Sequence, residues 1–273
     1  MKRFMFFIVL VLFASGISCG SSDKKSNKNI VTIKTEFGDI KVKLYEETTE
    51  HRNNFLKLVN DGFYNDLLFH RIIENFMIQG GDSDSKNAEP GIRLGGGSPG
   101  YTIPAELIPK YFHKKGALAA ARKGGPANPE KRSSGSQFYI IQGKTFRSGE
   151  LDTMIISKNN KLKNELLQKN LKGASNELNE FRANNNQQGF NICVAEIREE
   201  VDSIYEVNPK FTMSEEQITA YTTIGGYPSL DGEYTVFGEV VEGLDVLDKI
   251  AAVEVDERNR PRTDVKMQVE MAK

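Results

Sequence analysis

The sequence has little of what most catalytic or metal-binding sites need. Its 273 residues include only two cysteines, and its three histidines are scattered along the chain. Asp82 and Asp84 lack the remaining spacing of a calcium loop. The glycines of residues 91–100 have no Gly-Lys-Ser/Thr ending, which a phosphate-binding loop requires. The sequence therefore predicts no metal site and no cofactor.

The chain also lacks a surplus of charge of either sign. It has 36 basic and 37 acidic residues, which gives a formal net charge of −1. A protein that binds nucleic acid usually carries a basic surface, so we expect no nucleic-acid partner. The hydrophobic content of 38% is sufficient for a folded core, and the length fits one large domain or two small ones.

Long hydrophobic runs are absent apart from one near the start. Lys2-Arg3 precede the apolar run 4–14, which is too short to span a membrane comfortably, and small residues lead to Cys19. This pattern predicts a signal peptide over residues 1–18, a lipid-modified Cys19 and a flexible tether over 19–29. Simple secretion, with cleavage at a small-residue site, is the alternative. Both readings place the protein in a bacterial cell envelope, in the periplasm or as a membrane-anchored lipoprotein.

What is present is a series of short, strand-like stretches separated by glycine-rich turns. Two helices interrupt them: one begins after Thr48 or Thr49 and runs to about Asn60, and the other covers Leu244 to Ala251. The class is therefore mainly β, and the arrangement suits a closed barrel with capping helices. The expected strands cover residues 31–36, 40–45, 67–73, 76–79, 116–121, 137–142, 234–240 and 265–270.

Residues 148–223 have a different character and predict an inserted helical subdomain. They are rich in Asn, Gln, Lys and Glu, with leucines at near-helical spacing until 184–189 breaks the pattern. Ser214 and Gln217 are typical of a capping box at the start of a short further helix. We expect a helical hairpin plus a short helix, packed as an appendage that does not build the active site. Cys193 in this insertion is interpreted as a small packed hydrophobe.

The most informative segment is Phe69 to Asp82, FHRIIENFMIQGGD. Its apolar residues form a strand-like frame in which Arg71 and Gln79 are the polar exceptions. A surface pair on strand edges is the ordinary reading of these two residues. The segment offers no nucleophile and no paired carboxylates. It is therefore typical of a site that holds and polarises a ligand without cleaving it.

This segment resembles the signature of the cyclophilins, the peptidyl-prolyl cis/trans isomerases. Further blocks agree with the family in the same order: 32–40 resembles its opening hairpin, 135–141 (GSQFYII) its GSQFF strand, and 230–240 its LDGxxxVFGxV motif. The resemblance covers roughly residues 30–147 and 224–273. It implies the eight-stranded cyclophilin barrel over these two stretches.

The resemblance also implies a non-covalent mechanism. The amide resonance sets a rotation barrier of about 18–20 kcal/mol, so X-Pro isomers exchange in roughly tens to hundreds of seconds. A fixed donor near the proline nitrogen and an apolar pocket for its ring would stabilise the twisted bond. The roles carried over from the family are catalysis by Arg71 with Phe76 and Gln79, and substrate binding by Met77, Ala121, Gln137, Tyr139, Leu230 and Tyr234.

Two functional classes follow from these observations. The first is an isomerase that accelerates the folding of envelope proteins by acting on their proline-containing, extended segments. The second is a chaperone or protein-binding module that uses the helical insertion, with weak or auxiliary isomerase activity. The presence of Arg71 favours the first, because a binder has no need for a charged donor beside a proline pocket.

Overall fold

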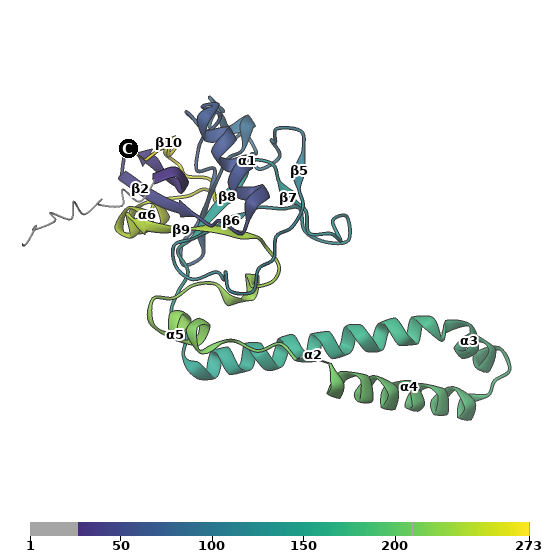
Figure 1. Ribbon diagram of the computed structural model, residues 1–273. Coiled ribbons are helices and arrows are strands. Elements are labelled where there is room, and N and C mark those ends of the chain that lie inside the picture. The colour runs from purple at the N-terminus through teal and green to yellow at the C-terminus, as the bar shows by residue number, and fades with distance from the viewer. Residues whose placement is uncertain (1–26, 209, 273) are drawn as a thin grey trace, which may run out of the picture.

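The computed structural model describes residues 27–208 and 210–272 (Figure 1). The expected signal peptide 1–18 and Cys19 lie outside these residues. A short 3-10 turn, η1 (Asn27–Asn29), leads into a sheet and helix core.

The body of the protein is an eight-stranded sheet in which all neighbours are antiparallel. A separate two-stranded sheet lies in the loop region between β4 and β8. The mainly β class and the strand number match the sequence prediction. The strands of the large sheet, in spatial order, are β10 (Gln268–Met271), β1 (Ile30–Thr35), β2 (Gly38–Leu44), β9 (Val236–Glu242), β6 (Ala117–Ala120), β8 (Phe138–Ile141), β4 (Met77–Gly80) and β3 (Arg71–Ile73), and the small sheet pairs β5 (Thr102–Ile103) with β7 (Ser133–Ser134).

The expectation of a fully closed barrel is corrected by the pairing of the edge strands. β3 and β10 share no ladder, and the two edges are joined through the segments before them, where Leu68 bridges Lys266. Backbone hydrogen bonds support this junction: the N–H of Phe69 donates to the carbonyl of Val265 at 2.9 Å. The sheet is thus strongly curled, and it closes over a few residues before each edge strand begins.

The two faces of the curled sheet carry separate apolar clusters because strand side chains alternate in direction. In β2, Ile40, Val42 and Leu44 are buried on the inner face. There they pack with residues of α1 (Thr49–Asn60) and α6 (Leu244–Ala251) in the main core. A smaller cluster lies on the opposite face and includes Met77 and Tyr139. The candidate site is built on this second face.

The two expected core helices are present. α6 has the predicted bounds, and α1 begins after Thr48 and is followed by Gly62, whose φ of 66° only glycine adopts at little cost. Thr48 is the N-cap residue, but its side chain makes no capping bond to the helix. Burial of Phe55 and Leu58 against the core therefore matters more for α1 than the cap does.

Four helices occupy the stretch between β8 and β9: α2 (Ser148–Gly173), α3 (Ser175–Ala183), α4 (Gln187–Val207) and α5 (Glu215–Thr223). α2 and α4 pair as a long hairpin that extends away from the sheet, with α3 at its tip (Figure 1). Lys163 on α2 and Asp202 on α4 join the two arms at 2.7 Å. The capping box at Ser214 and Gln217 is confirmed, with reciprocal bonds of 3.2 and 2.9 Å.

The hairpin has its own core, while its root is packed against the sheet domain. Cys193, as expected, is buried among leucines and isoleucine inside the hairpin. At the root, Tyr221 of α5 is fully buried with Phe112 and Phe146 of the sheet domain. The outer hairpin and the root are therefore two different structural units.

Candidate active site

The polar core of the candidate site comes from one cross-strand row. In the ladders β3–β4 and β4–β8, Arg71 lies opposite Gln79 and Gln79 lies opposite Tyr139. Directly paired residues place their side chains on the same face of a sheet. The alternation of the strands therefore brings these three side chains together on the face that carries the smaller apolar cluster.

A chain of hydrogen bonds fixes the guanidinium of Arg71. Its Nη1 donates to Oε1 of Gln79 at 3.2 Å, and Nε2 of Gln79 donates to Oε1 of Gln137 at 3.0 Å. Gln137 in turn donates to the carbonyls of Gly95 and Gly97 at 3.1 and 2.8 Å. A Cβ on Gly97 would collide with the carboxylate of Asp82, so glycine is needed for this loop to approach so closely.

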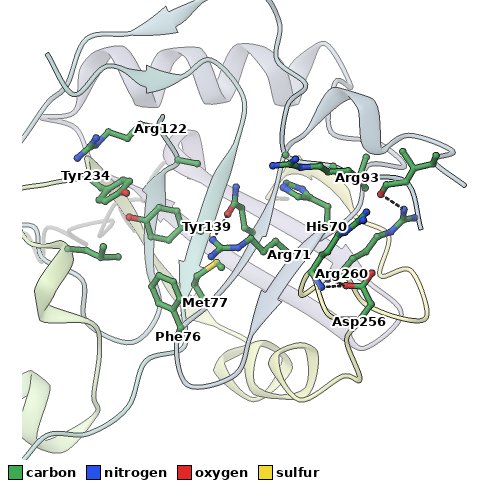
Figure 2. A pocket seen from close by; sticks show the side chains of 17 residues that line it. His70, Arg71, Phe76, Met77, Arg93, Arg122, Tyr139, Tyr234, Asp256 and Arg260 are labelled. Carbon is green, nitrogen blue, oxygen red and sulfur yellow. Dashed lines mark hydrogen bonds between the residues drawn. The ribbon is translucent and has the colours of Figure 1, made fainter. Parts of the chain in front are cut away.

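An apolar hollow lies beside Arg71. The turn between β3 and β4 places Asn75 at a φ of 61°, and the ring of Phe76 then packs against that of Tyr227, tilted by 33° with ring centroids 4.2 Å apart. The hollow belongs to a cavity of about 560 Å³. Figure 2 shows Phe76, Met77 and Tyr139 around the guanidinium, with Tyr234 and Arg122 farther along the same wall. Of the residues predicted for the site, those that line this cavity are Arg71, Phe76, Met77, Gln79, Ala121, Tyr139, Leu230 and Tyr234.

Gln137 is the one predicted site residue outside this lining. It borders a neighbouring hollow of about 410 Å³, which shares Gln79, Ala121 and Arg122 with the first. Gln137 is buried. Its side-chain amide donates to the carbonyls of Gly95 and Gly97 and accepts from Gln79. The structure thus places all nine predicted residues in one continuous region, with Gln137 behind Gln79.

A buried polar chain supports the hollow from behind. The hydroxyl of Tyr139 lies 3.0 Å from Nε2 of His113, whose Nδ1 lies 2.9 Å from Asp231. The hydroxyl of Tyr221 donates to the same carboxylate at 2.6 Å. Burial lowers the pKa of His113 and raises that of Tyr139. A neutral His113 that donates from Nδ1 to the carboxylate accepts a hydrogen bond from the Tyr139 hydroxyl at Nε2.

The wall on the other side of Arg71 is cationic. It contains His70, Arg93, Arg258 and Arg260, together with a single carboxylate, that of Asp256. His70 is 4% exposed, and neither of its ring nitrogens has a hydrogen-bond partner among the residues that the structure describes. Burial lowers its pKa to about 4, so the imidazole is neutral near pH 7. His70 is therefore a packed residue of this wall.

Within the described part of the chain, no group of three or more histidine, cysteine or acidic side chains could hold a metal ion. No helix formed by these same residues has the length and apolar character of a membrane span. The cavity lining, as described, has no serine, threonine, cysteine or lysine. What the arrangement offers chemically is a fixed cation beside an apolar hollow.

Comparison with protein families shows to which family the chain belongs. The model of the cyclophilin type peptidyl-prolyl cis-trans isomerase family matches residues 30–164 and 141–271. The chain belongs to this family. The resemblance seen in the motif blocks is thereby confirmed.

Relatives of this cyclophilin differ widely in length. A Streptococcus pyogenes protein named "Putative bifunctional phosphatase/peptidyl-prolyl cis-trans isomerase" is 30% identical over 239 residues, which cover 86% of this chain and 37% of that protein. Peptidyl-prolyl cis-trans isomerase-like 2 of Rhizopus delemar is 27% identical over 91% of this chain and 30% of its own length. This chain thus spans about a third of both. A "Putative peptidyl-prolyl cis-trans isomerase" of Staphylococcus saprophyticus is 26% identical over 90% of this chain and 92% of its own length.

A solved structure agrees with the fold of this cyclophilin. The crystal structure of a Cryptosporidium parvum cyclophilin type peptidyl-prolyl cis-trans isomerase superposes with a TM-score of 0.50 at 20% identity. The match covers 90% of this chain and 98% of that one. At this identity the likeness concerns the fold alone.

Several site residues of this cyclophilin were missed from the sequence. His113 and Asp231 are 118 residues apart, so no local pattern shows that they meet. Asp231 does lie within the 230–240 block, which was a signal that the position mattered. Nothing in the sequence placed Arg93 beside Arg258.

Proposed function

We propose that this protein catalyses cis/trans isomerisation of X-Pro bonds in extended protein segments, by electrostatic stabilisation of the twisted amide and with no covalent step. One observation carries the proposal: the Arg71 guanidinium is held by Gln79 beside an apolar hollow. As the bond twists, resonance is lost and the proline nitrogen gains lone-pair character. A donor that is already in place then stabilises the transition state more than the planar ground state.

Arginine suits this role better than the other donors in the cavity. The guanidinium keeps its charge at any physiological pH and presents several N–H groups in a rigid plane. Gln79 uses only one of these groups, so others remain for the substrate. The rings of Phe76 and Tyr139 supply apolar surface for the pyrrolidine, and His113 holds the Tyr139 hydroxyl on the side away from Arg71.

Replacement of Arg71 by alanine tests the proposal. Arg71→Ala should lower kcat/KM for an X-Pro peptide at least roughly tenfold, which corresponds to about 1.4 kcal/mol of transition-state stabilisation. The rate is measured by exchange between isomers in NMR spectra, with circular dichroism as the check on folding. Arg198→Ala is the matched control, because Arg198 is exposed on α4 of the hairpin. An unchanged exchange rate in folded Arg71→Ala would remove this residue from the mechanism.

A second candidate function concerns long protein clients. The hairpin exposes apolar side chains along α2 and α4, including Ile156 at 61% and Ile192 at 50%. These apolar side chains would be the points at which the hairpin contacts an unfolded client chain. We infer a chaperone role for the hairpin in addition to the peptide chemistry.

We also infer that the protein works in the cell envelope of a bacterium. The support is the sequence of the first residues: a basic start, a short apolar run, small residues and Cys19. A lipid on Cys19 would tether the enzyme to a membrane, where its clients would be proteins that fold after export. The expected tether 19–29 would link the anchor to the domain, and its last residues form the turn η1 (Asn27–Asn29).

A further inference from the structure

The cavity has two ends of opposite character, with Arg71 between them. One end is the apolar hollow around Phe76 and Tyr139. At the other end the cavity is lined by guanidinium groups, and Figure 2 shows Arg93 and Arg260 there beside His70, with Asp256 below them. The mechanism proposed above uses only the apolar end and Arg71, so the cationic end has no assigned role.

The arginines of this end are not equivalent. Arg260 is 5% exposed and is committed to the fold: it pairs with Asp264 at 2.9 Å and donates to the carbonyls of Ala88 and Glu89 at 3.0 and 2.8 Å. Because its charge is balanced and its donors are used, Arg260 serves as a support that ties the 88–92 loop to the 256–264 segment.

Arg93 and Arg258 are in the opposite situation. Both side chains are exposed at the rim. Arg93 makes no hydrogen bond or ion pair with any described residue. The Arg258 guanidinium has only a long contact of 3.5 Å to the carbonyl of Gly91. The nearby Asp256 carboxylate accepts the backbone N–H groups of Arg258 and Arg260 at 2.8 and 2.9 Å, and it forms no ion pair with either guanidinium.

This distribution leaves an excess of positive charge at one end of a concave site. Arg71, Arg93 and Arg258 form no ion pair with any described carboxylate, and the cavity lining has one acidic side chain, Asp256, whose charge interacts with Arg258 at longer range. Low-dielectric walls focus the field of such groups into the cavity. A guanidinium plane binds a carboxylate through two parallel N–H bonds, which makes a carboxylate the natural ligand here.

We propose that the end formed by Arg93 and Arg258 is a subsite for an acidic side chain of the substrate, within a few residues of the isomerising proline. The inference rests on the proposed function, because the proline ring must occupy the hollow for the flanking residue to reach the arginines. An extended chain advances about 3.3–3.6 Å per residue, so a residue a short way along the chain from the proline would reach the arginine end. The substrate class is therefore an X-Pro segment with a nearby Glu or Asp.

A paired peptide series tests the subsite. Each peptide has one proline in an alanine background, and Glu or its neutral isostere Gln stands at one position, up to three residues before or after the proline. NMR exchange gives KM and kcat for each peptide on the full chain. We expect at least one position at which Glu lowers KM about twofold to fivefold relative to Gln at low salt, the range of an exposed ion pair, with little change in kcat. At about 0.5 M salt the two peptides should converge, because the charges at the rim are screened.

Charge-neutral variants show which residues cause the preference. Arg93→Gln with Arg258→Gln should bring the ratio of the two KM values to about one, and Arg198→Gln on α4 should leave that ratio as in the wild type. A ratio of one at every position in the wild type, with both peptides still isomerised, would overturn the subsite and leave the isomerase intact. A preference that survives the double variant would overturn it too. Absence of catalysis on every peptide would instead count against the isomerase itself.

Discussion

At the residue scale, the three histidines are all buried and all have a lowered pKa. Burial is the largest cause for His51, His70 and His113, and it lowers the pKa of His70 to about 4. Glu106 and Asp231 partly offset this effect for His51 and His113, and the charge of Asp82 with the backbone of Leu68 partly offsets it for His70. The folded protein therefore keeps all three imidazoles neutral at a pH where unfolded histidine binds a proton.

This difference predicts a loss of stability in mild acid. Between the unfolded pKa near 6.5 and the folded value, the unfolded chain binds more protons, so the free energy of unfolding falls as pH falls. For His70 alone the loss amounts to about 2 kcal/mol at pH 5 relative to pH 7, and the full contribution is present above about pH 6.5. Urea unfolding at pH 7, 6 and 5 measures this loss in the free energy of unfolding.

A variant separates His70 from the other histidines. His70→Leu removes the titrating group without leaving a polar partner unpaired, so its stability should vary less between pH 7 and 5 than that of the wild type. If the free energy of unfolding fell equally with pH in the two proteins, or did not change with pH in the wild type, the buried imidazole would not control acid stability.

At the scale of elements, the insertion divides into a root and an outer hairpin. No described residue of 148–223 lines the 560 Å³ cavity, as the sequence suggested. Yet the root supports it: Tyr221 of α5 shares Asp231 with His113, which holds the Tyr139 hydroxyl, and Lys158 of α2 donates to the Asp231 carbonyl at 2.8 Å. Removal of the whole insertion would therefore disturb the apolar hollow, while the outer hairpin has a separate core.

A shortened protein tests the division. Lys163 and Asp202 are in contact, so residues 164–201 can be replaced by a short Gly/Ser loop without spanning a gap. We expect this variant to isomerise short X-Pro peptides at close to the wild-type rate and to assist the refolding of long proline-containing proteins less. Loss of short-peptide catalysis in a variant that melts cooperatively would place the hairpin in the catalytic machinery. If the shortened variant and the wild type assisted the refolding of long proteins equally, the chaperone inference would be refuted.

At the scale of the whole molecule, the proposed lipid anchor can be tested with the two cysteines of the chain. If Cys19 carries lipid, the protein should sediment with membranes when it is expressed in a bacterium, and Cys19→Ser should appear in the soluble envelope fraction. Cys193→Ser is the matched control, because Cys193 is buried in the hairpin core and should not affect the anchor. Membrane association of Cys19→Ser would refute the lipid anchor.

Much of this fold was determined by the sequence alone, because its signals are local. The alternation in β2, the bounds of α6 and the capping box at Ser214 each depend on a few neighbouring residues. The pairing of Arg71 with Gln79 also depends on a local feature, the tight turn between two short strands, but the sequence pattern did not predict it. The motif blocks indicated the family, and the resemblance to that family indicated which residues form the apolar hollow.

Tertiary structure alone decided the contacts between segments that are distant in the sequence. His113 meets Asp231 across 118 residues, and Arg258 reaches the 91–93 loop across 167. The incomplete closure of the sheet likewise depends on where β3 and β10 end, which a one-residue change of register would alter. Such contacts result from sheet curvature, strand register and side-chain packing acting together, and no single stretch of sequence contains that information.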